Sequence, residues 1–308
     1  GLIFFVLRLM PGGRVPDIGS CVDDHTIIVP VMNGADTAQR VREYLGKGLV
    51  VDAVIYTTAA ANEDYSITQL GQYTRILLGA VREEEHKAAK VSAGVLGEAG
   101  IEYEIPSDVR QAVWEKYIFN CAYNVITAYY LGNVEEIRAY EDRRAEFHML
   151  LKEALQVAKA DGVHIRQHYM EEEYQRFMRL SKGSTSSLKR DVEAGRPSEL
   201  ETFGGYLLER ARNLGVAVPL SEQFYDGMKE RSETGQTRTG RRKNEVRRVT
   251  AKKETSLEGM KFLEEIVRKL KGKSSRWIRR FLPDRKISRV CMSTTGRIIR
   301  RWTSMATK

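Results

Sequence analysis

Three polar side chains in the middle of the chain recur at intervals of four residues. Lys116, Asn120 and Asn124 would drift by only about 80° around an α-helix, because each residue turns by about 100°, and would therefore share one face. An ammonium group beside two amides can bind a small ligand that is rich in oxygen atoms. A solvated polar stripe on a surface helix shows the same spacing, although the apolar residues between these positions leave little of the helix for solvent.

A second group of polar residues follows further along the chain. The run 184–187, Ser-Thr-Ser-Ser, precedes Asp191 and Glu199. Hydroxyls at one helix start and a carboxylate near the next could contact a bound ligand, because helix N-termini present unpaired N–H groups and the positive end of the helix dipole. Ordinary helix capping explains the same residues equally well. The dipeptide Asn33-Gly34 is a weaker signal, since it is also typical of a simple turn.

The elements that must position these residues change in type at Pro106. Before Pro106, apolar runs of strand length alternate with helical segments, which predicts an α/β layer. The expected strands are 2–7, 26–32, 49–57, 74–79 and 101–105, and the expected helices are 38–45, with Asp36 as its N-cap, and 83–96. After Pro106 the pattern is helical alone, at 107–131, 134–161, 168–180, 187–194, 198–214 and 220–231, with a capping box of Ser198 and Glu201. The body is therefore predicted to be an α/β unit at 1–106 followed by an all-α unit at 107–230.

The order of these segments resembles the ketopantoate reductase (2-dehydropantoate 2-reductase) family. The resemblance is carried by Val31-Met32-Asn33-Gly34, by Trp114-Glu115-Lys116 with Asn120 and Asn124, and by Ser186-Ser187-Leu188 with Asp191, Gly195-Arg196 and Glu199. These motifs span most of residues 1–230. The resemblance implies a Rossmann-type sheet domain followed by a helical domain similar to that of 6-phosphogluconate dehydrogenase.

The same resemblance implies an activity and a set of roles. The activity is the reduction of 2-dehydropantoate to pantoate, a step towards pantothenate and coenzyme A. By analogy with the family, Lys116 would be the general acid that protonates the forming alkoxide. Ser187 would bind the substrate carboxylate, and Glu199 would accept a hydrogen bond from a substrate hydroxyl. Asn120 and Asn124 would hold the polyhydroxy chain of this small 2-keto acid.

The implied cofactor is NADPH, with Asn33 at the place where nicotinamide and substrate meet. A family member should also carry a strand followed by GxGxxG, whose glycines let the backbone approach the pyrophosphate, and this sequence contains no such motif. We therefore expect an incomplete Rossmann domain that begins at about its fourth strand. Three further departures from the family pattern are Met32, Val125 and Ser184.

Charge divides the chain into a body and a tail. Residues 1–230 hold 26 basic and 34 acidic side chains, a net charge of −8, whereas 231–308 hold 24 and 7, a net charge of +17. The basic character of the whole chain therefore gives no reason to expect nucleic-acid binding by the body. We expect a partly disordered tail with one amphipathic helix at 256–270, which could contact acidic surfaces. A solvated extension without a function is the alternative.

The cysteines and the apolar run at the start of the sequence indicate in which compartment the protein is expected. Its three cysteines, at 21, 121 and 291, do not have the CxxC spacing of a metal clip and favour a reducing compartment such as the cytoplasm. The apolar run 1–10 is interrupted by Arg8 and is shorter than the roughly 20 residues of a membrane span. The leading hypothesis is thus a cytoplasmic reductase, possible as a homodimer and without a metal. The alternative is an inactive remnant that serves as a binding or dimerisation module with a basic tail.

Overall fold

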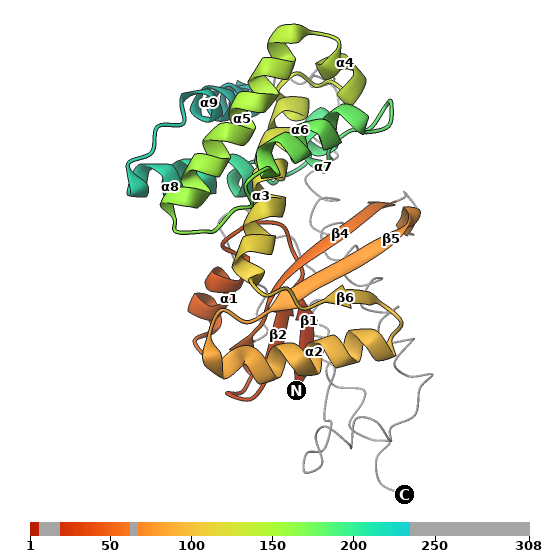
Figure 1. The fold of residues 1–308 in the computed structure, drawn as a ribbon, viewed down its shortest axis with the longest axis vertical. Helices are drawn as coiled ribbons and strands as arrows, with labels where there is room; N and C mark the ends of the chain where they lie inside the picture. Colours follow the sequence, from red (N-terminus) through yellow and green to blue (C-terminus); the bar gives the residue numbers. More distant parts are fainter. Residues whose placement is uncertain (6–18, 62–66, 235–308) are drawn as a thin grey trace, which may run out of the picture. The chain divides into compact units, whose positions relative to one another are not determined.

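The computed structural model describes residues 1–5, 19–61 and 67–234 (Figure 1). The predicted tail lies outside these residues from position 235 onward, and so does its expected amphipathic helix at 256–270. The described residues form two compact units that divide between Val109 and Arg110. The first unit contains all six strands of the described chain, and the second contains helices only. An α/β part followed by an all-α part is therefore the fold, as the sequence predicts.

Two three-stranded sheets form the centre of the first unit. Strands β1 (Leu2–Phe5), β2 (Ile27–Pro30) and β3 (Leu49–Val50) are parallel and lie in the order β1-β2-β3. Strands β4 (Asp52–Ala61) and β5 (Ile67–Gly79) are antiparallel, and β5 pairs in parallel with β6 (Glu102–Glu104). The single strand expected at 49–57 is thus divided between the two sheets. The division falls at Val51, whose N–H still donates to the carbonyl of Ile28 at 2.8 Å.

Helices cover both faces of β2, because all four of its residues are buried and alternate residues point to opposite sides. Ile28 packs in one cluster with Ala38 and Val41 of α1 (Thr37–Leu45). Ile27 and Val29 pack in another cluster with the apolar residues of α2 (His86–Glu98). Two short 3₁₀ turns, η1 (Gly19–Cys21) and η2 (Glu83–Glu85), complete this unit.

The N-terminus of α1 differs from its prediction in one detail. Asp36 occupies the N-cap position, but its side chain accepts no capping hydrogen bond. Its carboxylate instead forms an ion pair with Arg40 at 3.5 Å, one turn further along the helix. The residue was therefore placed correctly, and its role as a cap was wrong.

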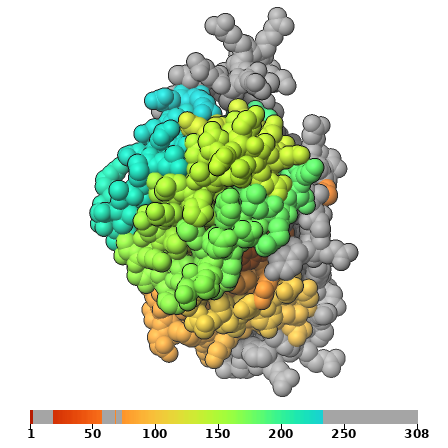
Figure 2. Space-filling model, turned by 45° about the horizontal axis from the view of Figure 1, so that its top comes forward, coloured from red at the N-terminus to blue at the C-terminus, as the bar shows by residue number. Residues whose placement is uncertain are grey.

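The second unit is built around the long helix α3 (Val109–Tyr129). The other elements of this unit are α4 (Val134–Arg138), α5 (Glu141–Ala160), α6 (Tyr169–Arg179), α7 (Ser187–Glu193), the π-helical turn η3 (Glu201–Gly205), α8 (Tyr206–Leu214) and α9 (Pro219–Thr234). Figure 2 shows side chains of the yellow-green, green and cyan parts of this unit in one closely packed surface. No helix among the described residues is both long enough and apolar enough to cross a membrane.

The helix expected at 134–161 is broken into α4 and α5, and that prediction was wrong. Tyr140 has extended backbone angles, φ −110° and ψ 132°, between the two helices. The break leaves the carbonyl of Arg138 without its next helical partner, and the guanidinium of Arg144 donates to that oxygen at 2.5 Å. A side chain from the following helix thus satisfies a backbone group that periodicity alone would assign to one continuous helix.

Two buried carboxylates connect the helices of this unit. Glu153 of α5, which is 3% exposed, accepts from the N–H groups of Leu220 and Ser221 at 3.0 and 2.8 Å and from the Ser221 hydroxyl at 2.6 Å. It therefore caps the first turn of α9 from another helix. Asp161, at the end of α5, binds the guanidinium groups of Arg110 and Arg210.

Candidate functional site

The face of α3 that carries the regularly spaced polar residues is not a solvated stripe. Asn124 is 5% exposed, and Lys116 and Asn120 are partly buried. The rest of the helix is largely buried too, through residues that include Tyr117 and Cys121. A lysine and two amides therefore line a polar strip within the helical unit, where hydrogen bonds are stronger than in water.

The start of α7 lies against this strip and brings Ser187 to it. Ser186 is the N-cap of α7, since its Oγ accepts from the N–H of Lys189 at 3.1 Å. The same hydroxyl lies 2.7 Å from that of Thr127, which is part of α3. This anchor places the Ser187 hydroxyl 3.5 Å from Oδ1 of Asn124. Ser186 is thus an ordinary cap, whereas Ser187 is directed at the strip.

Charged groups surround Lys116 from other elements. Burial lowers the pKa of its ammonium group to about 8, and the nearby charge of Arg176 lowers it further, while the negative charge of Glu199 raises it. The charges of Glu199 and Arg176 therefore both act on the ammonium group of Lys116. Among the residues that the sequence proposed for one site, the structure thus pairs Ser187 with Asn124 and Glu199 electrostatically with Lys116, while Asn120 lies on α3 between Lys116 and Asn124.

Arg176 is a residue of this region that the sequence analysis missed. It lies on α6, where its guanidinium sits 4.5 Å from the ring centroid of Phe119 and 2.9 Å from the carboxylate of Glu173. Its charge also acts on Tyr123, whose pKa burial raises to about 12. No spacing within α6 distinguishes this arginine from a surface residue, because only the packing of α6 on α3 brings it to Lys116.

Asn33 belongs to the first unit. It follows β2 and precedes α1, and its carbonyl oxygen accepts from the Thr37 hydroxyl at 2.9 Å. The following Gly34 has a φ of 117°, which a side chain would disfavour. This turn lies just beyond the carboxyl end of a parallel strand, which is where ligands bind in open α/β sheets.

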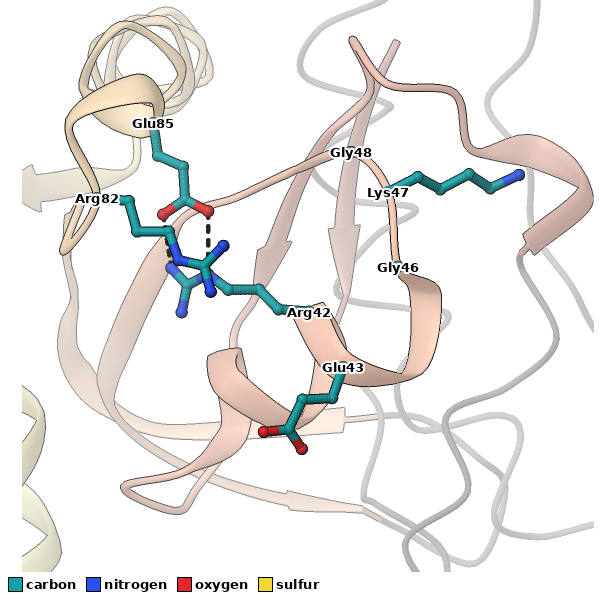
Figure 3. Close-up of a pocket in the computed structure, with 7 residues that line it drawn as sticks. All are labelled: Arg42, Glu43, Gly46, Lys47, Gly48, Arg82 and Glu85. Atoms are coloured by element: carbon teal, nitrogen blue, oxygen red, sulfur yellow. Dashed lines mark hydrogen bonds and ion pairs between the residues drawn. The ribbon is translucent and has the colours of Figure 1, made fainter.

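A pocket in the first unit is lined by Arg42, Glu43, Gly46, Lys47, Gly48, Arg82 and Glu85 (Figure 3). Figure 3 shows the side chains of Arg42 and Glu85 directed at each other, while that of Lys47 points away from them. The buried guanidinium group of Arg42 forms ion pairs with the carboxylates of Glu85 and Asp52. The charges of Arg42 and Glu85 therefore have a structural use, and this pocket belongs to the first unit, whereas the polar strip on α3 belongs to the second. The described residues also contain no cluster of His, Cys, Asp and Glu that could hold a metal ion.

A protonated amine flanked by a carboxylate, two amides and a hydroxyl can act on a small polar substrate in a defined way. The amine can donate a proton to an oxygen that gains negative charge. A pKa lowered to about 8 makes the ammonium group a stronger acid than an ordinary lysine, and the group is still mostly protonated at neutral pH. The amides and the hydroxyl can orient hydroxyl and carboxylate groups of the substrate.

Comparison with known proteins gives the same assignment for both parts of the chain. The family model described as ketopantoate reductase PanE/ApbA matches residues 12–83, and its C-terminal counterpart matches residues 108–232. A 2-dehydropantoate 2-reductase of Halobacterium salinarum is 25% identical over 205 residues, which are 66% of this chain and 66% of that protein. The chain thus spans about two thirds of the length of this relative.

Solved structures share the fold. The 2-dehydropantoate 2-reductase of Methylococcus capsulatus aligns with a TM-score of 0.66 at 24% identity, over 78% of this chain and 76% of that one. A D-mandelate dehydrogenase solved with NADH aligns with a TM-score of 0.67 at 16% identity, over 76% and 79% of the two chains. The family that the sequence motifs predict is confirmed by the two family models, one on each side of the boundary between the units. The chain belongs to the ketopantoate reductase family of oxidoreductases.

Proposed function

We propose that the protein reduces 2-dehydropantoate to pantoate with NADPH, a reaction of pantothenate and coenzyme A biosynthesis. The observation that carries this proposal is the ammonium group of Lys116. This group is partly buried, burial lowers its pKa to about 8, and the negative charge of Glu199 acts on it. The family membership and the order of the motifs support it. The reduction of a ketone needs a proton for the oxygen that becomes the alkoxide, and Lys116 is the donor that the polar strip offers.

The proposed roles follow the positions of the groups. Lys116 donates its proton to the former ketone oxygen and stabilises the negative charge that develops there. Ser187, which lies 3.5 Å from Asn124, binds the substrate carboxylate. Asn120 and Asn124 orient the hydroxyl-bearing chain, and Glu199 accepts a hydrogen bond from a substrate hydroxyl while keeping Lys116 protonated to a higher pH.

The chain offers a binding position for the nicotinamide end of the proposed cofactor. The turn at Asn33 and Gly34 lies beyond a parallel strand, where a nicotinamide ring could be bound by the Asn33 amide. A nicotinamide cofactor supplies the hydride when it is bound. The sequence contains no GxGxxG turn, the motif that binds the pyrophosphate in Rossmann domains.

The proposed setting includes a cytoplasmic location and a homodimer, and both stay predictions. A contact of the basic tail with acidic surfaces also stays a prediction, because residues 235–308 lie outside the described part of the chain. The inactive binding module, which was the alternative reading of the sequence, is an outcome of the following test.

The test of the proposed function is NADPH oxidation in the presence of 2-dehydropantoate. We expect turnover by the chain, and we expect Lys116→Ala to lower kcat by about 10² or more, because a positioned general acid typically contributes about 10² to 10⁴. Lys152→Ala, which changes an exposed lysine of α5, is the matched control. Equal turnover by the two variants would exclude Lys116 as the donor. Absence of turnover in the unaltered chain, with its helical unit folded, would favour the binding module.

A further inference from the structure

The π-helical turn Glu201–Gly205 separates Glu199 from the regular part of α8. In this turn the N–H of Tyr206 donates to the carbonyl of Glu201, five residues earlier, instead of four. A π turn contains one residue more than an α-helical turn, so it rotates the preceding chain by about 100° relative to an uninterrupted helix. The orientation of Glu199, which precedes the π turn, therefore depends on whether this turn is maintained.

Side chains of α3 hold the π turn on one side. The Tyr117 hydroxyl donates to the carbonyl of Thr202 at 2.8 Å, and the thiol of Cys121 donates to the carbonyl of Phe203 at 3.2 Å. Both donors are buried, and burial keeps Cys121 a thiol, since it raises the pKa of that group. A π turn is uncommon because it is poorly stabilised by itself, and these two bonds supply partners for its backbone from another helix.

A second contact holds the π turn from α9. The Tyr225 hydroxyl donates to both carboxylate oxygens of Glu201, at 2.9 and 3.0 Å. Gly204 allows the close approach, because a Cβ atom at that position would lie 2.6 Å from Cδ2 of Tyr225. Glu201 therefore does not form the capping box with Ser198 that the sequence predicts, and that prediction was wrong.

The residues that hold the π turn are sequence neighbours of the residues in the polar strip. Tyr117 follows Lys116, and Cys121 follows Asn120. Each member of a pair is turned by about 100° from the other around α3. One face of α3 thus carries the proposed proton donor, while the adjacent face fixes the turn that leads to Glu199.

We propose that Tyr117 and Cys121 are positioning residues, whose hydrogen bonds to the carbonyls of Thr202 and Phe203 hold the π turn and thereby fix the position of the preceding Glu199 relative to Lys116. The inference rests on the proposed function only for the catalytic meaning of Lys116. The two charged groups that act on Lys116 are Glu199, which precedes the π turn, and Arg176 of α6. Loss of the hydrogen bond from Tyr117 should loosen the position of Glu199 and leave Arg176 in place.

The test measures the pKa of Lys116 in the full chain without cofactor or substrate. Competitive acetylation with acetic anhydride over a series of pH values, read by peptide mass spectrometry, gives this pKa. We expect Glu199→Gln to lower it by about 1 unit or more, because an opposite charge at close range typically shifts a pKa by about 1 to 3 units. Tyr117→Phe should shift it in the same direction by a smaller amount, and should add nothing in the Glu199→Gln background.

Tyr130→Phe is the matched control, since it also removes one hydroxyl, which donates to Glu146 at 2.7 Å. This variant should leave the pKa of Lys116 unchanged. If circular dichroism shows that Tyr117→Phe is not folded, Cys121→Ala removes the other bond and should give a shift of the same sign. An unchanged pKa in the folded variant would overturn the proposal. The proposal would also be overturned if Tyr117→Phe shifted the pKa of Lys116 by the same amount in the Glu199→Gln background as in the unaltered chain. Because acetylation needs no turnover, the result is independent of whether the chain reduces 2-dehydropantoate.

Discussion

Arg42 and Glu85 form a two-point ion pair inside the first unit, with Nε to Oε1 at 2.9 Å and Nη2 to Oε2 at 2.7 Å. The side chains are 12% and 4% exposed. The same guanidinium binds the carboxylate of Asp52 at 2.5 Å and the carbonyl of Val50 at 2.8 Å. One arginine thereby connects α1, the point where the chain passes from β3 to β4, and the turn before α2.

Removal of one partner of this ion pair should destabilise the first unit, because it leaves the other charge buried without full compensation. Glu85→Gln leaves the buried guanidinium with less compensating charge, and we expect the free energy of unfolding to fall by about 3 kcal/mol, as when one partner of a buried pair is removed. Glu102→Gln, which alters the exposed pair of Glu102 with Arg75 at 3.6 Å, should cost under about 1 kcal/mol. Urea unfolding of both variants measures the difference, and equal losses would contradict the special role of Arg42.

The pH dependence of the proposed reaction should follow Lys116. A proton donor must be protonated in the reacting complex, so kcat/KM should fall as the pH rises through the pKa of this group, which is about 8. An ordinary exposed lysine would keep its proton to about 10.4. Steady-state assays over a range of pH values locate the basic limb. A limb at the ordinary value of lysine would show that burial does not act on the donor as described.

Substitution of Arg176 should move the basic limb of the pH profile of kcat/KM in the opposite direction from substitution of Glu199. The positive charge of Arg176 lowers the pKa of Lys116, so Arg176→Met should raise this pKa and extend activity to higher pH. The methionine keeps apolar contact with the Phe119 ring, over which the guanidinium lies at 4.5 Å. Arg179→Met, at the end of the same helix, is the control. A limb that does not move in Arg176→Met would remove Arg176 from the site.

Glu153 should stabilise the second unit through its charge. In Glu153 the Oε1 atom accepts from the N–H of Leu220 at 3.0 Å and the Oε2 atom from that of Ser221 at 2.8 Å. Glu153→Gln preserves the size of the side chain but replaces one of these acceptors by an amide donor. We expect a loss of about 1.5 to 3 kcal/mol, the range for hydrogen bonds to charged groups. Glu146→Gln, whose carboxylate accepts one hydroxyl bond at 2.7 Å, should cost less. Thermal unfolding followed by circular dichroism compares the two variants, and similar losses would mean that the cap of α9 does not depend on charge.

The sequence by itself determined the class of fold and the composition of the strip on α3. Apolar periodicity is a local property, so the change from strands and helices to helices alone at Pro106 could be read directly, and α3 has nearly the bounds expected for it. A spacing of four residues also fixes which side chains share a helix face. Lys116, Asn120 and Asn124 were found for this reason.

The breaks and turns between the elements were decided by contacts between distant residues. The helix expected at 134–161 is divided at the extended Tyr140, and the Arg144 guanidinium satisfies the carbonyl of Arg138 that the break frees. The strand expected at 49–57 is divided because its two parts join different sheets. The π turn at Glu201–Gly205 has no local signature either. It depends on hydroxyl and thiol donors that lie more than eighty residues away along the chain.

The electrostatic character of the site was likewise decided by the tertiary structure. The sequence supplied Lys116 and Glu199, but a pKa depends on burial and on the distance to other charges. The packing of α6 on α3 brings Arg176 to Lys116, and the turn before α8 brings Glu199 there. Spacing along one helix can single out Lys116, whereas the pKa of its ammonium group depends on the three segments whose groups act on it.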